Sequence, residues 1–257
     1  AGAMRRDSQR LLMLVVVAAL LVFFHQQGSG GTAGSNSPRG GMPAREQTAV
    51  QVTAAPPPPP ERRTTRKRPS PPPQPGGGAE FLVSFATTKG NVTFQAHREW
   101  APQGVEQLRQ MVNEGFFNGG TPESRNPKGG IGIFRCVPKF VVQFGIHGTP
   151  ETARKWGVRV IKDDKVKHTN AKGTLTFASA GPNTRTTQLF INLHDNAFLD
   201  KMGFATLAEC ISGCDVIDSF EMQYREKPNQ GAIQQKGNEY LRANFPKLDY
   251  ITGASIV

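Results

Sequence analysis

The sequence of 257 residues has a formal net charge of +11, and 37% of its residues are hydrophobic. Ten Lys and Arg residues against three acidic ones place +7 of that charge in residues 1–79, which leaves an ordinary +4 for the remainder. A basic arm of this kind favours acidic surroundings and gives little reason to expect nucleic-acid binding. The sequence shows no nucleophilic Ser/His/Asp set, paired carboxylates or metal-ligand spacing, so a hydrolase is disfavoured and no metal or cofactor is expected.

An apolar run at residues 11–24 follows three arginines near the start of the sequence. Its length corresponds to about 21 Å of helix, which is shorter than the ~30 Å hydrocarbon core of a bilayer. We therefore predict that residues 1–27 form a signal peptide or a short signal-anchor helix. Either form would deliver the chain to the secretory pathway lumen, free or tethered as a single-pass protein through residues 11–24. An arginine-rich transit segment leading to an organelle lumen is the alternative.

Residues 28–79 are rich in Pro and Gly, with proline runs at 56–60 and 71–73 and a Gly triplet at 76–78. Proline runs favour an extended conformation, and this composition offers too little apolar surface to fold. The segment is predicted to be a disordered basic linker. A further hypothesis is that its proline runs engage the binding site of the domain that follows.

Residues 80–257 show the patterns of a folded domain. The predicted elements are strands at 81–87 and 91–97, a helix from 102 to about 115, a surface loop at 120–130, two strands within 134–145, a polar segment at 149–172, strands flanking the turn at 181–183, a short helix at 215–224 and a final strand at 248–256. Many short strands with two or three helices predict a barrel or a sandwich.

The apolar stretch Phe134–Gly145 contains an arginine and a glutamine, Arg135 and Gln143, on either side of a break at Pro138. Side chains alternate along a strand, so Val141 and Gln143 share one face while the residues between and after them share the other. A buried arginine needs compensation. One interpretation is that both polar residues reach water or an internal carboxylate; the other is that they line a binding face.

A second stretch, Phe177–Asn192, runs from a strand through a Gly-Pro-Asn turn into another strand. Gln188 and Phe190 share one face of that strand, and Leu189 and Ile191 share the other. Together the two stretches offer an arginine, two glutamines and several apolar side chains. Such a surface suits a short apolar ligand whose amide groups need hydrogen bonds.

The motifs at these positions resemble those of cyclophilin-type peptidyl-prolyl cis-trans isomerases. They are Phe-Arg-x-Val-Pro-x-Phe-x-x-Gln-x-Gly at 134–145, Ala-Gly-Pro-Asn-Thr-x-x-x-Gln-x-Phe-Ile at 180–191, Leu-Asp at 199–200 and Gly-Phe-Ala at 203–205. Separated motifs that occur in this order make a specific signal. The resemblance covers about residues 80–257. It implies a mainly β fold, a closed eight-stranded antiparallel β-barrel capped by two α-helices, with the active groove on its outer surface.

The resemblance also implies roles for individual residues. Arg135 would be catalytic and would favour the twisted imide of an X–Pro bond. The substrate-binding residues would be Phe140, Val141, Phe190 and Leu199 in a proline pocket, Gln143 and Gln188 on flanking amides, Ala178 and Ser179 through backbone groups, and Phe198 at the rim.

Three positions depart from the best-known members of that family. Phe198 stands where many have tryptophan, Val141 where methionine is usual, and residues 201–204 where many have a histidine, with Phe204 expected to fill that side of the pocket. These changes put tight binding of cyclosporin-type inhibitors in doubt. They affect binding more than the arginine, so activity with altered substrate preference is expected.

The predicted function is therefore a peptidyl-prolyl isomerase that assists the folding of proline-containing client polypeptides, acting as a monomer. The alternative is a weakly catalytic scaffold module that binds proline peptides.

Two of the three cysteines, Cys210 and Cys214, lie four residues apart without histidine partners. Free thiols are the favoured interpretation, and a disulfide in an oxidising compartment is the alternative.

Overall fold

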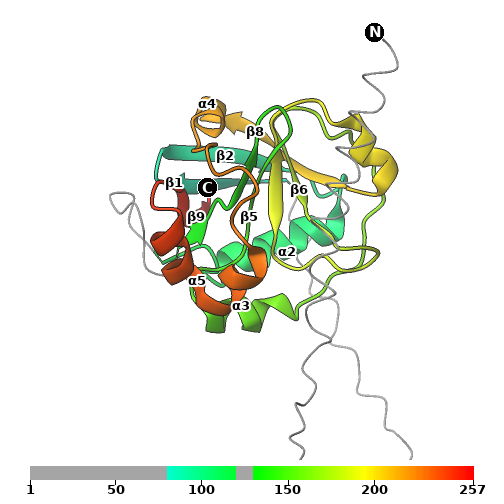
Figure 1. Cartoon of the computed structure of the whole chain (residues 1–257). Coiled ribbons are helices and arrows are strands. Elements are labelled where there is room, and N and C mark those ends of the chain that lie inside the picture. The colour runs from blue at the N-terminus through cyan, green and yellow to red at the C-terminus, as the bar shows by residue number, and fades with distance from the viewer. Residues whose placement is uncertain (1–79, 120–129) are drawn as a thin grey trace, which may run out of the picture. The chain divides into compact units, whose positions relative to one another are not determined.

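The computed structural model of the protein describes residues 80–119 and 130–257 (Figure 1). The predictions for residues 1–27 and 28–79, and nearly all of the loop predicted at 120–130, lie outside the described residues. The elements are β1 (Phe81–Thr87), β2 (Gly90–Ala96), α2 (Pro102–Asn113), β3 (Ile131–Gly132), β4 (Arg135–Val137), β5 (Val141–Phe144), α3 (Pro150–Gly157), β6 (Thr174–Phe177), β7 (Leu189–Asn192), the 3₁₀ helix η1 (Ala197–Met202), β8 (Thr206–Ser212), α4 (Cys214–Asp218), α5 (Gln230–Asn244) and β9 (Tyr250–Ile256).

The strands form one antiparallel sheet in the order β3-β9-β1-β2-β8-β6-β7-β5-β4. The sheet curls so that the β3 edge meets the chain that follows β5, through the antiparallel bridge between Ile131 and His147. The Gly148 N–H also donates to the Gly130 carbonyl over 3.1 Å. The predicted mainly β, barrel-like fold is confirmed, and its strand count is nine because of the two-residue β3.

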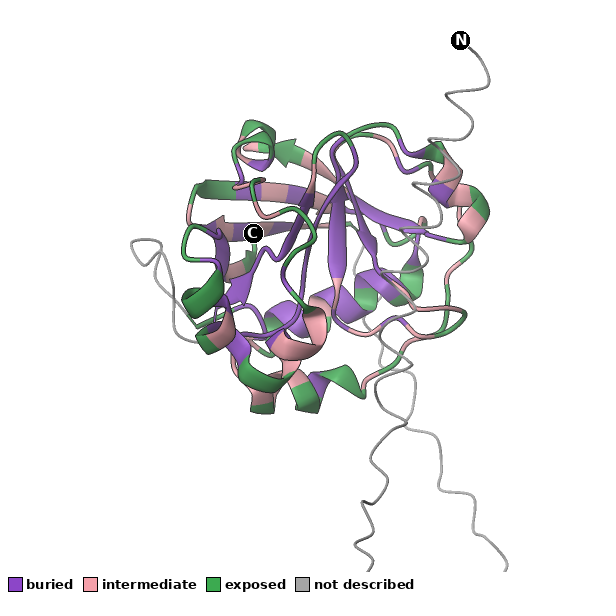
Figure 2. Ribbon diagram, in the orientation of Figure 1, coloured by how far each residue is buried: buried purple, intermediate pink, exposed green. Residues whose placement is uncertain are grey.

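The interior of the curled sheet is apolar, and α2 and α4 close it from two sides (Figures 1 and 2). Val105, Leu108 and Met111 of α2 and Ile217 of α4 belong to the same buried cluster as the strand residues. Aromatic edges meet at its centre, since the ring of Phe85 lies 5.0 to 5.9 Å from three other phenylalanine rings in T-shaped contacts. Such edge-to-face packing adds stability beyond the area buried.

Three helices were not predicted, namely α3, α5 and the 3₁₀ helix η1, so the described residues hold four α-helices where two were expected, and α4 is shorter than predicted. The segment predicted to be polar contains α3, whose only buried residue is Trp156. Helix α5 begins after Asn229, whose side chain accepts from the Ala232 N–H, and it is kinked at Gly237. The short helix predicted at 215–224 ends at Asp218 in the structure. Helix α3 buries a single residue, and α5 is kinked by long-range contacts. Neither helix therefore shows a regular spacing of apolar residues in the sequence.

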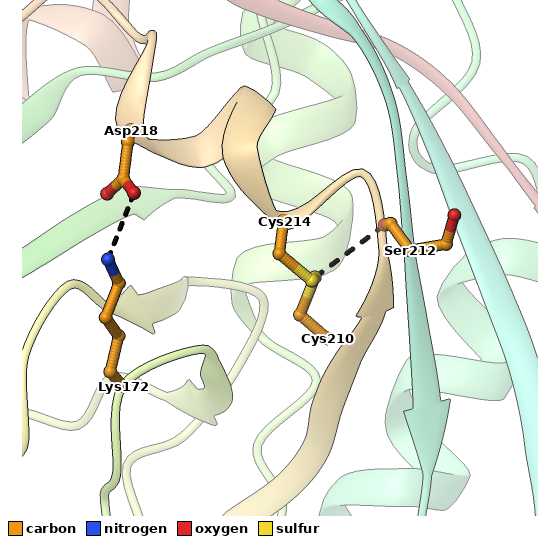
Figure 3. Close-up of a disulfide and its surroundings, with 5 residues drawn as sticks. All are labelled: Lys172, Cys210, Ser212, Cys214 and Asp218. Atoms are coloured by element: carbon orange, nitrogen blue, oxygen red, sulfur yellow. Dashed lines mark hydrogen bonds and ion pairs between the residues drawn. A yellow bond between two sulfur atoms is a disulfide. The ribbon is translucent and has the colours of Figure 1, made fainter.

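Cys210 and Cys214 form a disulfide, so the favoured interpretation as free thiols is wrong (Figure 3). Gly213, at the start of α4, has a φ of 67°, a conformation that favours glycine. This turn brings the two Cα atoms to 5.9 Å, within the range that a disulfide needs. The bond ties the end of β8 to the start of α4, beside the Lys172–Asp218 ion pair.

Candidate active site

The site is built where three neighbouring strands place side chains on the outer face of the sheet. The turn between β4 and β5, with Lys139 at a φ of 58°, folds the two strands back so that Arg135 pairs with Gln143. Gln143 in turn pairs with Phe190 of β7. The alternation predicted for β5 and β7 is confirmed, because Val142, Leu189 and Ile191 lie in the interior cluster.

A chain of hydrogen bonds runs across these strands. Arg135 Nη1 donates to Gln143 Oε1 over 3.1 Å, and Gln143 Nε2 donates to Gln188 Oε1 over 2.9 Å. Arg135 and Gln143 are buried, with 7% and 2% of their surface exposed. Buried polar side chains that bond one another hold a single arrangement.

Arg135 also pairs with an acidic residue that the sequence motifs do not contain. Its Nε and Nη2 lie 2.8 Å and 2.7 Å from one carboxylate oxygen of Glu226. Arg135 thus meets a carboxylate, although that of Glu226 is partly exposed, and it also lines an apolar pocket. Glu226 is 91 residues away in a turn without regular pattern, so no local signal identifies it.

The guanidinium borders a small apolar pocket of about 20 Å³. Its lining residues are Arg135, Phe140, Val141, Gln143, Ala178, Phe190, Leu199 and Phe204. The apolar members form a cluster separate from the barrel interior. Phe204 meets the ring of Phe190 edge-on at 5.8 Å, so the expectation that Phe204 fills this side is confirmed.

Phe198 does not line this pocket. It stacks on Phe140 with ring centroids 5.9 Å apart and is only partly buried. It thus contacts the pocket wall through Phe140 without lining the pocket.

A larger cavity of about 480 Å³ adjoins the pocket, and the two share Ala178. Gln188 and Ser179 line this cavity and not the small pocket. Its far wall includes Val158 and Val160, which follow α3 and have 79% and 56% of their surface exposed. An apolar wall open to solvent suits the side chains of a bound peptide.

The backbone groups predicted to bind substrate are partly occupied. The Ala178 N–H donates to the Gln188 carbonyl over 2.9 Å, which leaves the Ala178 carbonyl as the available group. The Ser179 hydroxyl donates to the Gly181 carbonyl over 2.8 Å within its own turn.

Burial shifts the pKa of two groups near the site. Desolvation raises the pKa of the Cys136 thiol to about 12, with smaller contributions from Asp249 and Glu221. Desolvation lowers the pKa of His147, against a smaller opposing effect of its hydrogen bond at Thr149. The Cys136 thiol therefore stays protonated at neutral pH and is not suited to act as a nucleophile.

Within the described residues, one grouping of side chains could hold a metal ion: Glu80, His97 and Glu99. The His97 Nδ1 lies 2.9 Å from a Glu80 oxygen and 3.6 Å from a Glu99 oxygen. None of the three lines either cavity of the site.

The site is an apolar pocket on the outer face of a curled antiparallel sheet, lined by Arg135 and by the amide of Gln143, with Gln188 in the adjoining cavity, and this arrangement is that of a β-barrel protein with a peptide-sized surface site. The family model of cyclophilin type peptidyl-prolyl cis-trans isomerases matches residues 82–237. The chain belongs to this family. The predicted family and its isomerase activity on proline-containing peptides are confirmed.

Curated relatives agree with this assignment. A peptidyl-prolyl cis-trans isomerase of Acinetobacter baylyi is 27% identical over 54% of this chain and 71% of its own length. Isomerase A of Dickeya dadantii is 28% identical over 59% and 76%, and isomerase B of Escherichia coli is 27% identical over 54% and 84%. A solved cyclophilin-type isomerase of Cryptosporidium parvum aligns with a TM-score of 0.49 at 17% identity, over 69% of this chain and 98% of that one.

Proposed function

We propose that Arg135 is the catalytic residue and acts on the prolyl nitrogen. Rotation about an X–Pro bond is slow because the C–N bond has partial double-bond character. Twisting the bond localises a lone pair on the nitrogen. A guanidinium N–H directed at that lone pair is favoured only in the twisted state, so it lowers the barrier without stabilising either planar form.

The prolyl ring would enter the apolar pocket beside Arg135. Phe140, Val141, Phe190 and Leu199 supply its walls. At about 20 Å³ the pocket has room for about one water molecule. Binding of a prolyl ring therefore requires a side chain of the pocket wall to move.

The peptide on either side of the proline would follow the line of polar groups. Gln143 lines the small pocket, Gln188 lines the larger cavity, and the hydrogen bond between them joins the two. Each can exchange a mutual hydrogen bond for one to a peptide amide. The Ala178 carbonyl and the outer face of Ser179 continue the path toward the larger cavity.

The observation that carries this proposal is the buried guanidinium at the edge of an apolar pocket. A charge-assisted hydrogen bond is worth about 1.5–3 kcal/mol, and about 1.4 kcal/mol corresponds to tenfold in rate. We expect Arg135→Ala to lower kcat/KM on a proline tetrapeptide at least about tenfold. The matched control is Arg154→Ala, since that side chain is 65% exposed in α3. Equal rates in Arg135→Ala and the parent, in a folded protein, would contradict the role.

The second candidate is a scaffold that binds proline peptides with little catalysis. Two observations favour it: the pocket is nearly filled, and Glu226 already pairs with the guanidinium. NMR exchange spectroscopy separates the two. Accelerated cis-trans exchange of a bound peptide supports the enzyme, and binding with unchanged exchange supports the scaffold.

We further propose that the protein assists the folding of client polypeptides in the lumen of the secretory pathway, as a monomer. The Cys210–Cys214 disulfide supports an oxidising compartment. Residues 80–119 and 130–257 contain no helix long and apolar enough to cross a membrane; any tether would be residues 11–24, outside the described part. Protease protection of the full chain in isolated vesicles tests the compartment, and light scattering tests the monomer.

A further inference from the structure

We infer that Glu226 is a positioning residue for the isomerase reaction: its carboxylate holds the Arg135 guanidinium facing the prolyl pocket. The inference rests on the catalytic role proposed above for Arg135. Glu226 itself does not line the pocket.

The contact is close and one-sided. Arg135 Nε donates to a single carboxylate oxygen, Oε1, over 2.8 Å, and Nη2 lies 2.7 Å from the same oxygen as an ion pair. The opposite nitrogen, Nη1, donates to Gln143 over 3.1 Å. Two partners on different edges fix the plane of the guanidinium, and its carbon lies 5.7 Å from the centre of the Phe140 ring.

The segment that carries Glu226 is itself anchored to the site strand. The Arg225 carbonyl accepts the N–H of Cys136, the residue after Arg135, over 3.2 Å. The Glu221 N–H donates to Asp249 over 2.7 Å, and the Tyr224 ring meets Phe245 edge-on. The turn that carries the Glu226 carboxylate is therefore held in place by hydrogen bonds and a ring contact.

Two of the five guanidinium N–H groups of Arg135 donate hydrogen bonds, Nε to Glu226 and one Nη1 N–H to Gln143, while Nη2 lies within ion-pair distance of Glu226. Within residues 80–119 and 130–257, the second N–H of Nη1 and the N–H groups of Nη2 donate no hydrogen bond. These are the groups available to a prolyl nitrogen in the pocket.

Removing the carboxylate would leave a guanidinium that is 8% exposed without its compensating charge. A buried unpaired charge is strongly unfavourable, so the flexible side chain would turn toward water. Glu226 has 38% of its side chain exposed and does not line the pocket. The Arg135 side chain would therefore reach water by moving toward the position of Glu226 and away from the pocket. The transition-state contact would be lost while the apolar pocket stays in place.

The test measures kcat and KM separately in the full chain. A misplacement of about 1 Å costs up to about a hundredfold in rate. We expect Glu226→Ala to lower kcat about tenfold with little change in KM. Glu226→Gln removes the charge but keeps an acceptor oxygen at the same reach, so we expect its kcat to lie between those of Glu226→Ala and the parent. Glu221→Ala is the matched control, because its carboxylate lies in the same segment and accepts from the Gln223 N–H.

A double-mutant cycle separates positioning from general support of the fold. If Glu226 acts through Arg135, adding Glu226→Ala to Arg135→Ala changes kcat less than about twofold. The Nε–H signal of Arg135 in NMR spectra, protected in the parent and in Glu226→Gln, is expected to exchange rapidly in Glu226→Ala. If the alanine variant does not fold, Glu226→Asp, which shortens the side chain by one carbon, takes its place, with the same expected loss.

The outcomes are distinct for the two claims. Parent-like kcat in Arg135→Ala overturns the proposed mechanism and this inference together. A tenfold loss in Arg135→Ala with parent-like kcat in Glu226→Ala overturns the inference alone. So does a Glu226→Gln variant as slow as Glu226→Ala, or a loss that persists in the Arg135→Ala background.

Discussion

Arg135 and Cys136 are adjacent on β4, yet their side chains enter opposite environments. Arg135 borders the outer pocket, and Cys136 belongs to the interior cluster with 2% of its surface exposed. The pKa of about 12 keeps this thiol protonated at neutral pH. Because side chains alternate along a strand, the charged side chain of Arg135 and the unreactive thiol of Cys136 lie on opposite faces of β4.

His147 is the residue through which acid should weaken the domain. Its ring is buried beside Phe116, and its Nδ1 accepts the Thr149 N–H over 3.0 Å. Burial lowers its pKa below the ordinary value of 6.5. The unfolded chain then binds the proton more readily than the folded one, so this contribution to stability is present above the ordinary pKa and is lost as pH falls below it.

We expect the free energy of unfolding of His147→Asn, which keeps an acceptor for Thr149, to fall less than that of the parent between pH 7 and pH 5. Urea denaturation at each pH measures it. His194→Asn, a change at an exposed residue, is the control. A parent-like fall in His147→Asn would show that His147 does not carry the effect.

At the scale of elements, α5 depends on one glycine. Gly237 interrupts the helix with a φ of 59° and a ψ of −144°, a combination that is essentially restricted to glycine. The turn lets the Asn238 N–H donate to the Gly148 carbonyl over 2.8 Å, and the Asn238 side chain donate to Gly130 over 3.0 Å. Helix α5 is thereby fastened to both chain segments that join where the sheet curls together.

Gly237→Ala should therefore destabilise the domain strongly. An added Cβ would overlap the Gly148 carbonyl oxygen, whose backbone cannot withdraw without breaking the same contact. Together with backbone strain of about 1–3 kcal/mol, we expect a loss of at least about 3 kcal/mol in unfolding free energy. Gly157→Ala is the control, since a Cβ there meets nothing within 4 Å. Equal midpoints of denaturation for both variants would contradict the argument.

The elements that sequence patterns predicted are those whose signal is local. Strands β4, β5 and β7 follow from alternation around Arg135, Gln143 and Phe190, and their motifs led to the pocket residues. Glu226 and the kink at Gly237 depend on partners about 90 residues distant. Nothing in their neighbouring residues encodes those partners, so the network that holds the guanidinium had to come from the structure.

The polar chain of the site runs through separate elements of the whole molecule. Glu226 comes from the turn before α5, Arg135 from β4 and Gln143 from β5, and Gln188 directly precedes β7. Since β5 and β7 also pack their other faces into the barrel interior, the geometry of the site is tied to the stability of the core. Loss of core packing and loss of activity should then occur together.

This dependence makes residues 80–257 the expected functional unit. Every pocket residue lies between Arg135 and Phe204, and Glu226 completes the network. We expect a chain lacking residues 1–79 to keep kcat/KM within about twofold of the full chain and the same thermal midpoint, because no described contact is removed. A coupled isomerase assay measures kcat/KM of both chains, and thermal unfolding measures their midpoints. The Arg135→Ala variant of each chain serves as the control with lowered activity. A clear rise in kcat/KM after deletion would instead support self-inhibition by the proline runs at 56–60 and 71–73, since removing a competing ligand raises the fraction of open sites.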